Sequence, residues 1–257
     1  MVTTQQARVA PVTVAKDLSI ADLRTALAAG WRDFCAAPGY GLFFGAIYLL
    51  AGLYLWYALT TQGQSMWLIP VVAGFPLIAP FTAVGLYEVS RRREAGLPLT
   101  WGGVLGALRG HGDEQLPMMG GFIFVGFTFW MILAHGIFAI FMSESGMGAE
   151  SLSLLSTGTG IAMLSVGSVI GAGVAFVFYM VTVISLPMLV DRNVDFLTAI
   201  IVSLATVRSN TVVMALWAAF IAVTLFAAML PAFAGLLVAL PVLGHATWHL
   251  YRRAVVA

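Results

Sequence analysis

The sequence predicts an all-α membrane protein, a polytopic bundle of six transmembrane helices arranged as three hairpins with amphipathic helices on the cytoplasmic surface. Composition is the first reason, because 61% of the 257 residues are hydrophobic and 9% are charged, whereas about a quarter are charged in ordinary soluble domains. The second reason is a series of apolar stretches of about the 20 residues that cross a bilayer. The third is that the basic residues fall on one side of this topology.

The chain begins with a polar region that has no hydrophobic periodicity, so we expect residues 1–17 to form a disordered cytoplasmic tail. Residues 18–34 are expected to form an amphipathic helix at the membrane interface. Its apolar face is predicted from residues that recur every three or four positions, namely Ile20, Leu23, Leu27 and Trp31. Asp33 falls elsewhere on the helical wheel, which places it outside this apolar face.

Six apolar segments predict the membrane spans, at 40–60, 67–89, 116–142, 158–190 and the two halves of 211–250. The last stretch has no acidic residue, lysine or arginine over 40 positions, and as one helix it would be about 60 Å long, twice the hydrocarbon thickness. We therefore predict a hairpin whose turn lies near 229–233, where Pro231 cannot continue the preceding helix. Two more interfacial helices are expected, at 97–110 and 191–210.

The basic residues orient the bundle. All 12 fall in segments on one face of the six-span topology: Arg8, Lys16, Arg24, Arg32, Arg91, Arg92, Arg93, Arg109, Arg192, Arg208, Arg252 and Arg253. The other face carries only Glu144 and Glu150. Because short basic loops stay in the cytoplasm, we expect a bacterial inner-membrane protein with both termini cytoplasmic. The expected cytoplasmic anchors, which hold interfacial helices or anionic headgroups, are Arg91, Arg92, Arg93, Arg252 and Arg253.

Residues 18–257 are expected to form one membrane domain with an internal repeat. Three units each run from an interfacial helix through an outward span, a turn and an inward span to an arginine, at 18–93, 97–192 and 195–253. This order predicts a three-fold hairpin repeat. The alternative is that any series of hydrophobic hairpins looks periodic.

Small residues at a spacing of four predict faces where helix backbones approach closely. Gly41 and Gly45 form one such face in the first span, and Gly167, Gly171 and Ala175 form another in the fourth. We expect the fourth span to pack in the centre of the bundle, or else to dock a partner subunit.

Three histidines fall within the predicted spans, and each has two interpretations. His135, near the outer end of the third span, ligates haem or copper, or it is a neutral side chain bonded to a neighbouring helix. His245 and His249 share one helix face and could open a metal site, or they meet polar headgroups. No further ligand is clearly placed to complete either site, and Cys35 is the only cysteine, so no metal or cofactor is expected.

No enzyme motif is present, since the sequence has no phosphate-binding glycine loop and no serine nucleophile elbow. A net charge of +1 implies no nucleic-acid partner. A pump would need ionisable residues near the middle of its spans, and the predicted spans have none there. The sequence therefore predicts a non-enzymatic scaffold or accessory subunit, with the lipid bilayer and another membrane subunit as partners. The alternative is a passive channel or carrier for a small neutral or lipidic solute, which a sealed, side-chain-filled centre would exclude.

Four stretches carry a family resemblance: WRDF (31–34), PGYGLFFGAIY (38–48), PLIAPFTAVGLYEVSRRRE (76–94) and SLPMLVDR (185–192). They resemble a family of bacterial integral membrane proteins of unknown function, some of whose members are labelled as cytochrome c oxidase subunits. The resemblance implies no catalytic residues. Because a haem–copper core needs more spans and more ligand histidines than this chain has, the label implies an accessory or assembly protein.

Overall fold

A computed structural model describes residues 13–63, 67–107, 115–142 and 155–256 of the protein. Nearly all of this is helical, in the order β1 (Thr13–Val14), α1 (Ile20–Ala36), α2 (Pro38–Thr61), α3 (Leu68–Glu94), α4 (Trp101–Gly106), α5 (Gln115–Met142), α6 (Gly158–Thr182), α7 (Ser185–Asp191), α8 (Phe196–Ser209), α9 (Thr211–Met229), α10 (Leu236–Ala254) and β2 (Val255–Val256). Arg8, Arg109, Glu144 and Glu150, which entered the charge prediction, lie outside the described residues.

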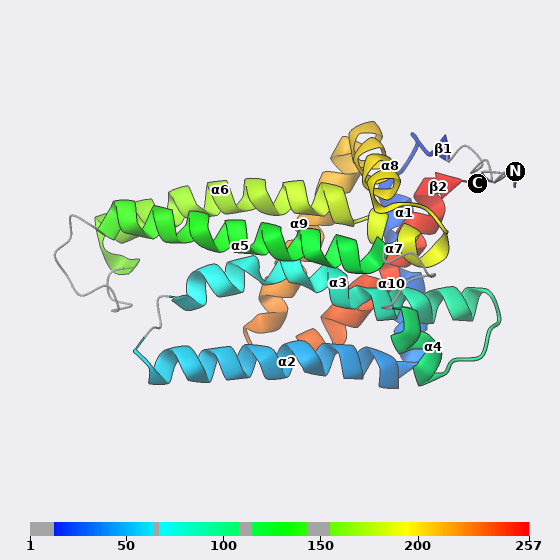
Figure 1. The fold of residues 1–257 in the computed structure, drawn as a ribbon, viewed down its shortest axis with the longest axis horizontal. Coiled ribbons are helices and arrows are strands. Elements are labelled where there is room, and N and C mark those ends of the chain that lie inside the picture. The colour runs from blue at the N-terminus through cyan, green and yellow to red at the C-terminus, as the bar shows by residue number, and fades with distance from the viewer. Residues whose placement is uncertain (1–12, 64–66, 108–114, 143–154, 257) are drawn as a thin grey trace, which may run out of the picture.

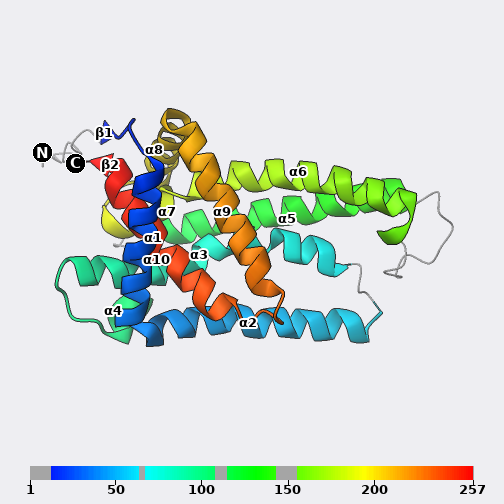
Figure 2. The same ribbon diagram turned by 180° about the vertical axis from the view of Figure 1, so that it is seen from behind.

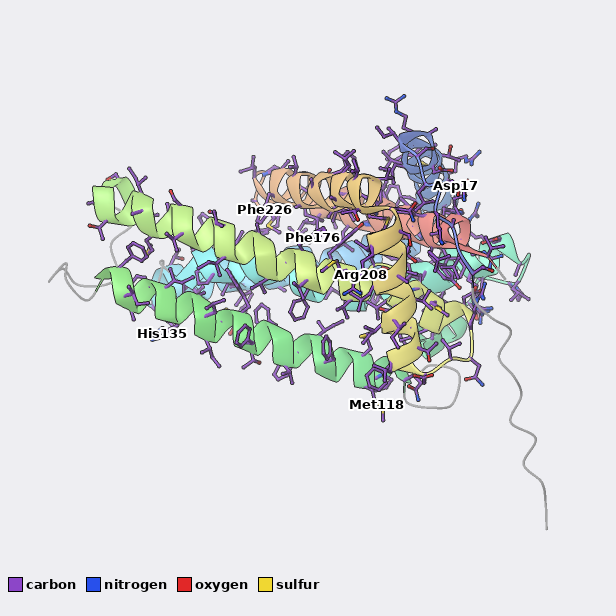
Figure 3. The ribbon with its side chains drawn as sticks, turned by 90° about the horizontal axis from the view of Figure 1, so that it is seen from above. Asp17, Met118, His135, Phe176, Arg208 and Phe226 are labelled. Carbon is purple, nitrogen blue, oxygen red and sulfur yellow. The ribbon has the colours of Figure 1, made fainter. Side chains whose placement is uncertain are left out.

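Four long helices, α2, α3, α5 and α6, run along the longest axis of the molecule and alternate in direction (Figure 1). At one end, α1 and α8 lie across this axis (Figures 1 and 3). We call this end the collar; it comprises α1, α4, α7, α8, the last turns of α3 and the second half of α10. Every described lysine and arginine lies in the collar or its flanking loops, as the predicted topology requires.

Side-chain caps start the two transverse helices. In α1, the Ser19 amide donates to Asp22 Oδ2 at 2.8 Å and the Asp22 amide donates to Ser19 Oγ at 3.3 Å, a reciprocal arrangement that satisfies two otherwise free donors. In α8, Asp195 Oδ1 accepts from the Thr198 amide at 2.8 Å. The predicted helices at 18–34 and 191–210 are thus present, whereas the described part of 97–110 contains only the six-residue helix α4, and residues 108–110 lie outside the described residues.

Four described helical segments are long and apolar enough to cross a membrane: Pro38–Thr61, Gln115–Phe141, Gly158–Asp191 and Thr211–Met229. The prediction of six spans is not confirmed. The predicted 158–190 span is interrupted after Thr182, where α8 reaches into the break: Ser203 Oγ accepts from the Ile184 amide at 3.2 Å and donates to the Met180 carbonyl at 2.6 Å. In the last predicted hairpin, α9 and α10 are joined by a turn that follows Met229, but α10 is not among the helices long and apolar enough to cross.

The expectation of a disordered tail is wrong at Thr13 and Val14. Thr13 and Val14 pair antiparallel with Val256 and Val255, so this part of the predicted disordered tail is an ordered strand that ties the two ends of the chain together. In α1, Ile20 and Trp31 of the predicted apolar face are 52% and 51% exposed, which leaves them available to a membrane interface. A second face of the helix is buried, made of Ala26, Ala29 and Gly30 together with Asp33 and Phe34, because α10 packs along it.

A cluster of fully buried large side chains lies in the collar. Leu86 of α3, Ile184 before α7, Leu186 of α7, and Trp248 and Tyr251 of α10 are each at most 1% exposed. These large side chains fill the end of the bundle between α3, α7 and α10. The collar is therefore closed, in contrast to the space between the long helices farther along the axis.

Candidate functional site

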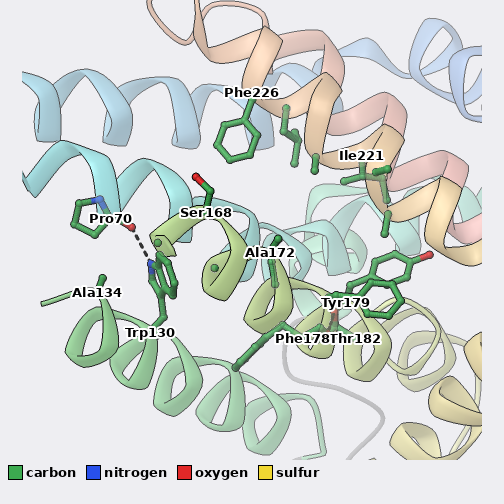
Figure 4. A pocket seen from close by; sticks show the side chains of 18 of the residues that line it. Pro70, Trp130, Ala134, Ser168, Ala172, Phe178, Tyr179, Thr182, Ile221 and Phe226 are labelled. Carbon is green, nitrogen blue, oxygen red and sulfur yellow. Dashed lines mark hydrogen bonds between the residues drawn. The ribbon is translucent and has the colours of Figure 1, made fainter. Parts of the chain in front are cut away.

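A cavity of about 760 Å³ lies between α3, α5, α6, α9 and α10 (Figure 4). Its described lining is almost wholly apolar, with small residues on α6 and α9 and aromatic rings at intervals. Its wall on α9 is a run of alanines, namely Ala215, Ala218, Ala219 and Ala222. Such volume and chemistry suit a hydrophobic small molecule.

The cavity is bounded at the collar by a hydrogen bond between two of its helices. The hydroxyl of Tyr179, on α6, donates to the main-chain carbonyl of Met214, on α9, at 2.9 Å. Beyond this link, α6 and α9 have few contacts with each other. Both nevertheless contribute to the cavity lining. Figure 4 shows Phe226 and Ile221 of α9 across from Ser168 and Ala172 of α6. The cavity is therefore partly open between these two helices.

Two hydroxyls of the lining are bonded within their own helices. Thr182 donates to the Phe178 carbonyl, and Thr247 donates to the Leu243 carbonyl, both at 2.8 Å. On the α5 side, the indole N–H of Trp130 donates to the Pro70 carbonyl at 2.9 Å, joining α5 to α3. These threonine hydroxyls therefore have no proton to donate to a ligand, and most of the lining that a ligand would meet is apolar.

His135 lies far from the collar, at the exposed end of α5 (Figure 3). Its ring stacks on Trp67, with centroids 5.2 Å apart and planes 8° apart, and both side chains line the cavity. The contact that the structure shows for His135 is this aromatic stack.

The two predicted glycine faces have different surroundings. A Cβ atom at Gly41 would lie 2.7 Å from the Phe34 ring, and one at Gly45 would lie 2.8 Å from Leu237 Cα, so α2 and α10 approach closely there. Gly167, Gly171 and Ala175 instead line the cavity. A Cβ atom at Gly167 would meet nothing within 4 Å, so no described helix packs closely against that position, and of the two expectations only docking of a partner remains there.

A buried polar network occupies the junction of α1, α3 and α10 in the collar. Asp33 is 7% exposed, and its carboxylate accepts from Ser90 Oγ at 2.6 Å, from Arg93 Nε at 2.9 Å and from His249 Nε2 at 2.8 Å. Ser90 Oγ is also 2.8 Å from His245 Nδ1. Burial by itself would raise the pKa of Asp33, but the hydrogen bonds from His249, Ser90 and Arg93 outweigh it and hold the pKa well below its ordinary value.

This network changes the interpretation of the paired histidines. His245 and His249 do project toward one side of α10, but His245 is fully buried, so polar headgroups do not surround it. The carboxylate that the sequence appeared to lack comes from Asp33, 216 positions away from His249. Among the described residues, no group of three or more His, Cys, Asp or Glu side chains is placed to hold a metal ion.

All five predicted anchor arginines have acidic partners within the chain. Arg91 and Arg92 both bond Glu88, at 2.7 and 2.6 Å, and the Glu88 side chain is 3% exposed. The other three link segments far apart in the sequence: Arg93 to Asp33, Arg252 to Glu94 and Asp191, and Arg253 to Asp17 and Asp22. They therefore fasten the collar together internally.

Sequence reasoning missed Asp33, Ser90 and the alanine face of α9. The only local signal for Asp33 was its position one residue before Phe34 and three after Gly30, on the face of small residues that α1 buries. Ser90 follows the fully buried Val89, and no pattern in its own segment indicates a polar partner on α1.

Comparison with known proteins supports the membrane class. A family model described as "Predicted integral membrane protein (DUF2189)" matches residues 68–191, which run from α3 through α7. No curated protein and no solved structure matches the chain.

Proposed function

We propose that this integral membrane protein binds the acyl chain of a lipid, or a similarly apolar molecule, in the cavity between its helices. The main support for this proposal is the cavity, which is lined by apolar side chains and is partly open between α6 and α9. A ligand of this class reaches the cavity sideways from the bilayer and needs no aqueous path. Of the two functions expected from the sequence, this one corresponds to a lipidic solute.

The closed collar argues for binding rather than conduction. Leu86, Ile184 and Leu186 are fully buried between the cavity and the end of the bundle, and a conducting pore would need a polar or wettable path at this point. The proposal assigns no reaction to the protein.

The basic collar supports the orientation expected from the sequence, with both termini in the cytoplasm of an inner membrane. Arg24, Arg32 and Arg208 are exposed around the collar, where positive charge favours the cytoplasmic face and its anionic lipids. Under this orientation α1 and α8 lie along the cytoplasmic surface of the bilayer.

Filling the cavity should weaken binding of an apolar ligand. In the double variant Ala218→Phe/Ala222→Phe, two rings occupy the space beside α6, and we expect the affinity for a fluorescent long-chain fatty acid to fall about tenfold, about 1.4 kcal/mol. The matched control is Val223→Phe, since Val223 is on the same helix but 69% exposed; its affinity should be unchanged. Titration of the detergent-purified protein measures both, and equal affinities in all three proteins would contradict the proposal.

A non-enzymatic scaffold or accessory subunit of a membrane complex is the second candidate. The observation that favours it is the outer half of α2, where Tyr54, Trp56 and Tyr57 are 69%, 57% and 66% exposed, because aromatic rings are enriched where subunits meet. We expect a partner subunit to co-purify from native membranes in mild detergent and to be lost in a Tyr54→Ser/Tyr57→Ser variant. Purification of the unaltered protein alone after crosslinking would exclude this role.

A further inference from the structure

The turn between α9 and α10 differs in chemistry from the other two hairpin turns. The α2–α3 connection begins with the exposed residues Thr61, Gln62 and Gly63, and the sequence between α5 and α6 contains Glu144 and Glu150. By contrast, residues 230–235 read Leu-Pro-Ala-Phe-Ala-Gly, and Leu230 at their start is 85% exposed. A turn of this composition is disfavoured in water and suits a hydrocarbon environment.

The tip of this hairpin also stops beside the middle of α2. Phe233 packs its ring where a Cβ atom at Gly52 would stand, and Leu237 lies against Gly45. From Gly52, α2 continues for nine more residues to Thr61, or about 14 Å at 1.5 Å per residue. Figure 2 shows α9 and α10 running obliquely to the long helices and meeting beside α2, well before its end.

The returning helix is too short in apolar sequence to cross a bilayer. Its first part, 236–244, is apolar, but from His245 onward α10 carries the buried collar network and ends with Arg252 and Arg253. A Cβ atom at Gly30 of α1 would lie 2.6 Å from the Ala246 amide nitrogen, which places this second part beside the transverse helix. About 20 apolar residues are needed for a span, and α10 offers about half of that number.

The backbone of the turn is hydrogen-bonded within itself. Ala232 donates to the Leu230 carbonyl, Phe233 to Met229 and Ala234 to Pro231, each at 2.9 Å, and Leu236 donates to Phe233 at 3.0 Å. Ala232 and Phe233 adopt φ values of +47° and +64°, which allows so compact a reversal. Non-spanning backbone inside a membrane must satisfy its polar groups in this way.

We infer that α9 and α10 form a re-entrant hairpin that enters the bilayer from the collar side, turns within the hydrocarbon and returns to the collar. The membrane is then crossed by α2, α3, α5 and α6, and both termini remain on the same side. Although α9 is long and apolar enough to cross, its tilt keeps its far end beside Gly52 (Figure 2). The exposed Leu230 side chain faces lipid acyl chains. This inference is independent of any ligand in the cavity.

Cysteine labelling in cells and vesicles tests the topology. The unaltered chain has one cysteine, Cys35, which is exposed in the collar and reports on that side of the membrane. In a Cys35→Ala background, Gln62→Cys reports on the opposite side, and Leu230→Cys and Ala234→Cys report on the hairpin turn. Each protein is treated with a membrane-impermeant maleimide in intact cells and in inside-out vesicles, and then again after detergent solubilisation.

We expect Cys35 and the Gln62→Cys thiol to react from opposite sides of the membrane. In intact membranes, the Leu230→Cys and Ala234→Cys thiols should react at least tenfold more slowly than these two, and they should become reactive after solubilisation. Rapid labelling of the two turn variants from the Gln62 side would show that the hairpin crosses the membrane. Rapid labelling from the Cys35 side would show that it lies outside the bilayer. Either result overturns the inference, and labelling after solubilisation verifies that the thiols are intact.

Discussion

Replacing Asp33 with alanine should lower the stability of the protein by about 3–5 kcal/mol, because removing one member of a buried ionic network leaves its partners uncompensated. Ser90 and His245 are fully buried, and Arg93 and His249 also lose the carboxylate that they contact. The measurement is the thermal unfolding midpoint in detergent, followed by near-UV circular dichroism. The control is Asp17→Ala, because the Asp17 side chain is 76% exposed in its pair with Arg253, and such surface pairs contribute less than about 1 kcal/mol. Equal losses in both variants would contradict the proposed role of the network.

The same carboxylate predicts an acid-dependent loss of stability. The pKa of Asp33 lies below its ordinary value, so its contribution is fully present above about pH 4, the usual pKa of aspartate, and is lost as the pH falls toward the folded-state pKa. Asp33→Asn should remove this contribution at neutral pH and flatten the stability curve between about pH 4 and pH 2.5. If the stability of Asp33→Asn fell with decreasing pH as steeply as that of the unaltered protein, the acid sensitivity would come from other carboxylates.

Gly30→Val should separate α1 from α10 and cost at least about 1–3 kcal/mol, the usual range for overpacking. A Cβ atom at this position would lie 2.6 Å from the Ala246 nitrogen and 2.7 Å from the Val242 carbonyl oxygen. These are main-chain atoms, so no side-chain rotation can relieve the contact. Because the Asp33 network also joins α1 to α10, the losses of stability in Gly30→Val and Asp33→Ala should not be additive. The midpoint of thermal unfolding and the yield of folded protein measure the effect.

The matched control for Gly30 is Gly39→Ala, at the start of α2. A Cβ atom there would meet nothing within 4 Å, and alanine favours a helix over glycine by about 1 kcal/mol. We expect this variant to be as stable as the unaltered protein or slightly more stable. If Gly30→Val were equally well tolerated, the close approach of α1 and α10 would be wrong.

Local sequence was sufficient where the determining interactions are local. The apolar stretches gave the positions of α2, α5 and α9 because helix formation in an apolar segment depends on neighbouring residues. Pro231 placed the last turn correctly, because a proline locally prevents the preceding helix from continuing. The amphipathic pattern of 18–34 also found α1, but it did not reveal the second face, on which small residues admit α10.

By itself the sequence therefore determined the membrane class, most of the helices, and the gathering of basic residues at one end, since all of these follow from composition and short-range spacing. Only the tertiary structure decided the partners of Asp33, the exposure of Gly167 to a cavity, and the position beside α2 at which the last hairpin stops. Each of these depends on which helices pack together and where along their lengths. Contacts such as that between Asp33 and His249, 216 positions apart, cannot be recognised from the pattern of neighbouring residues.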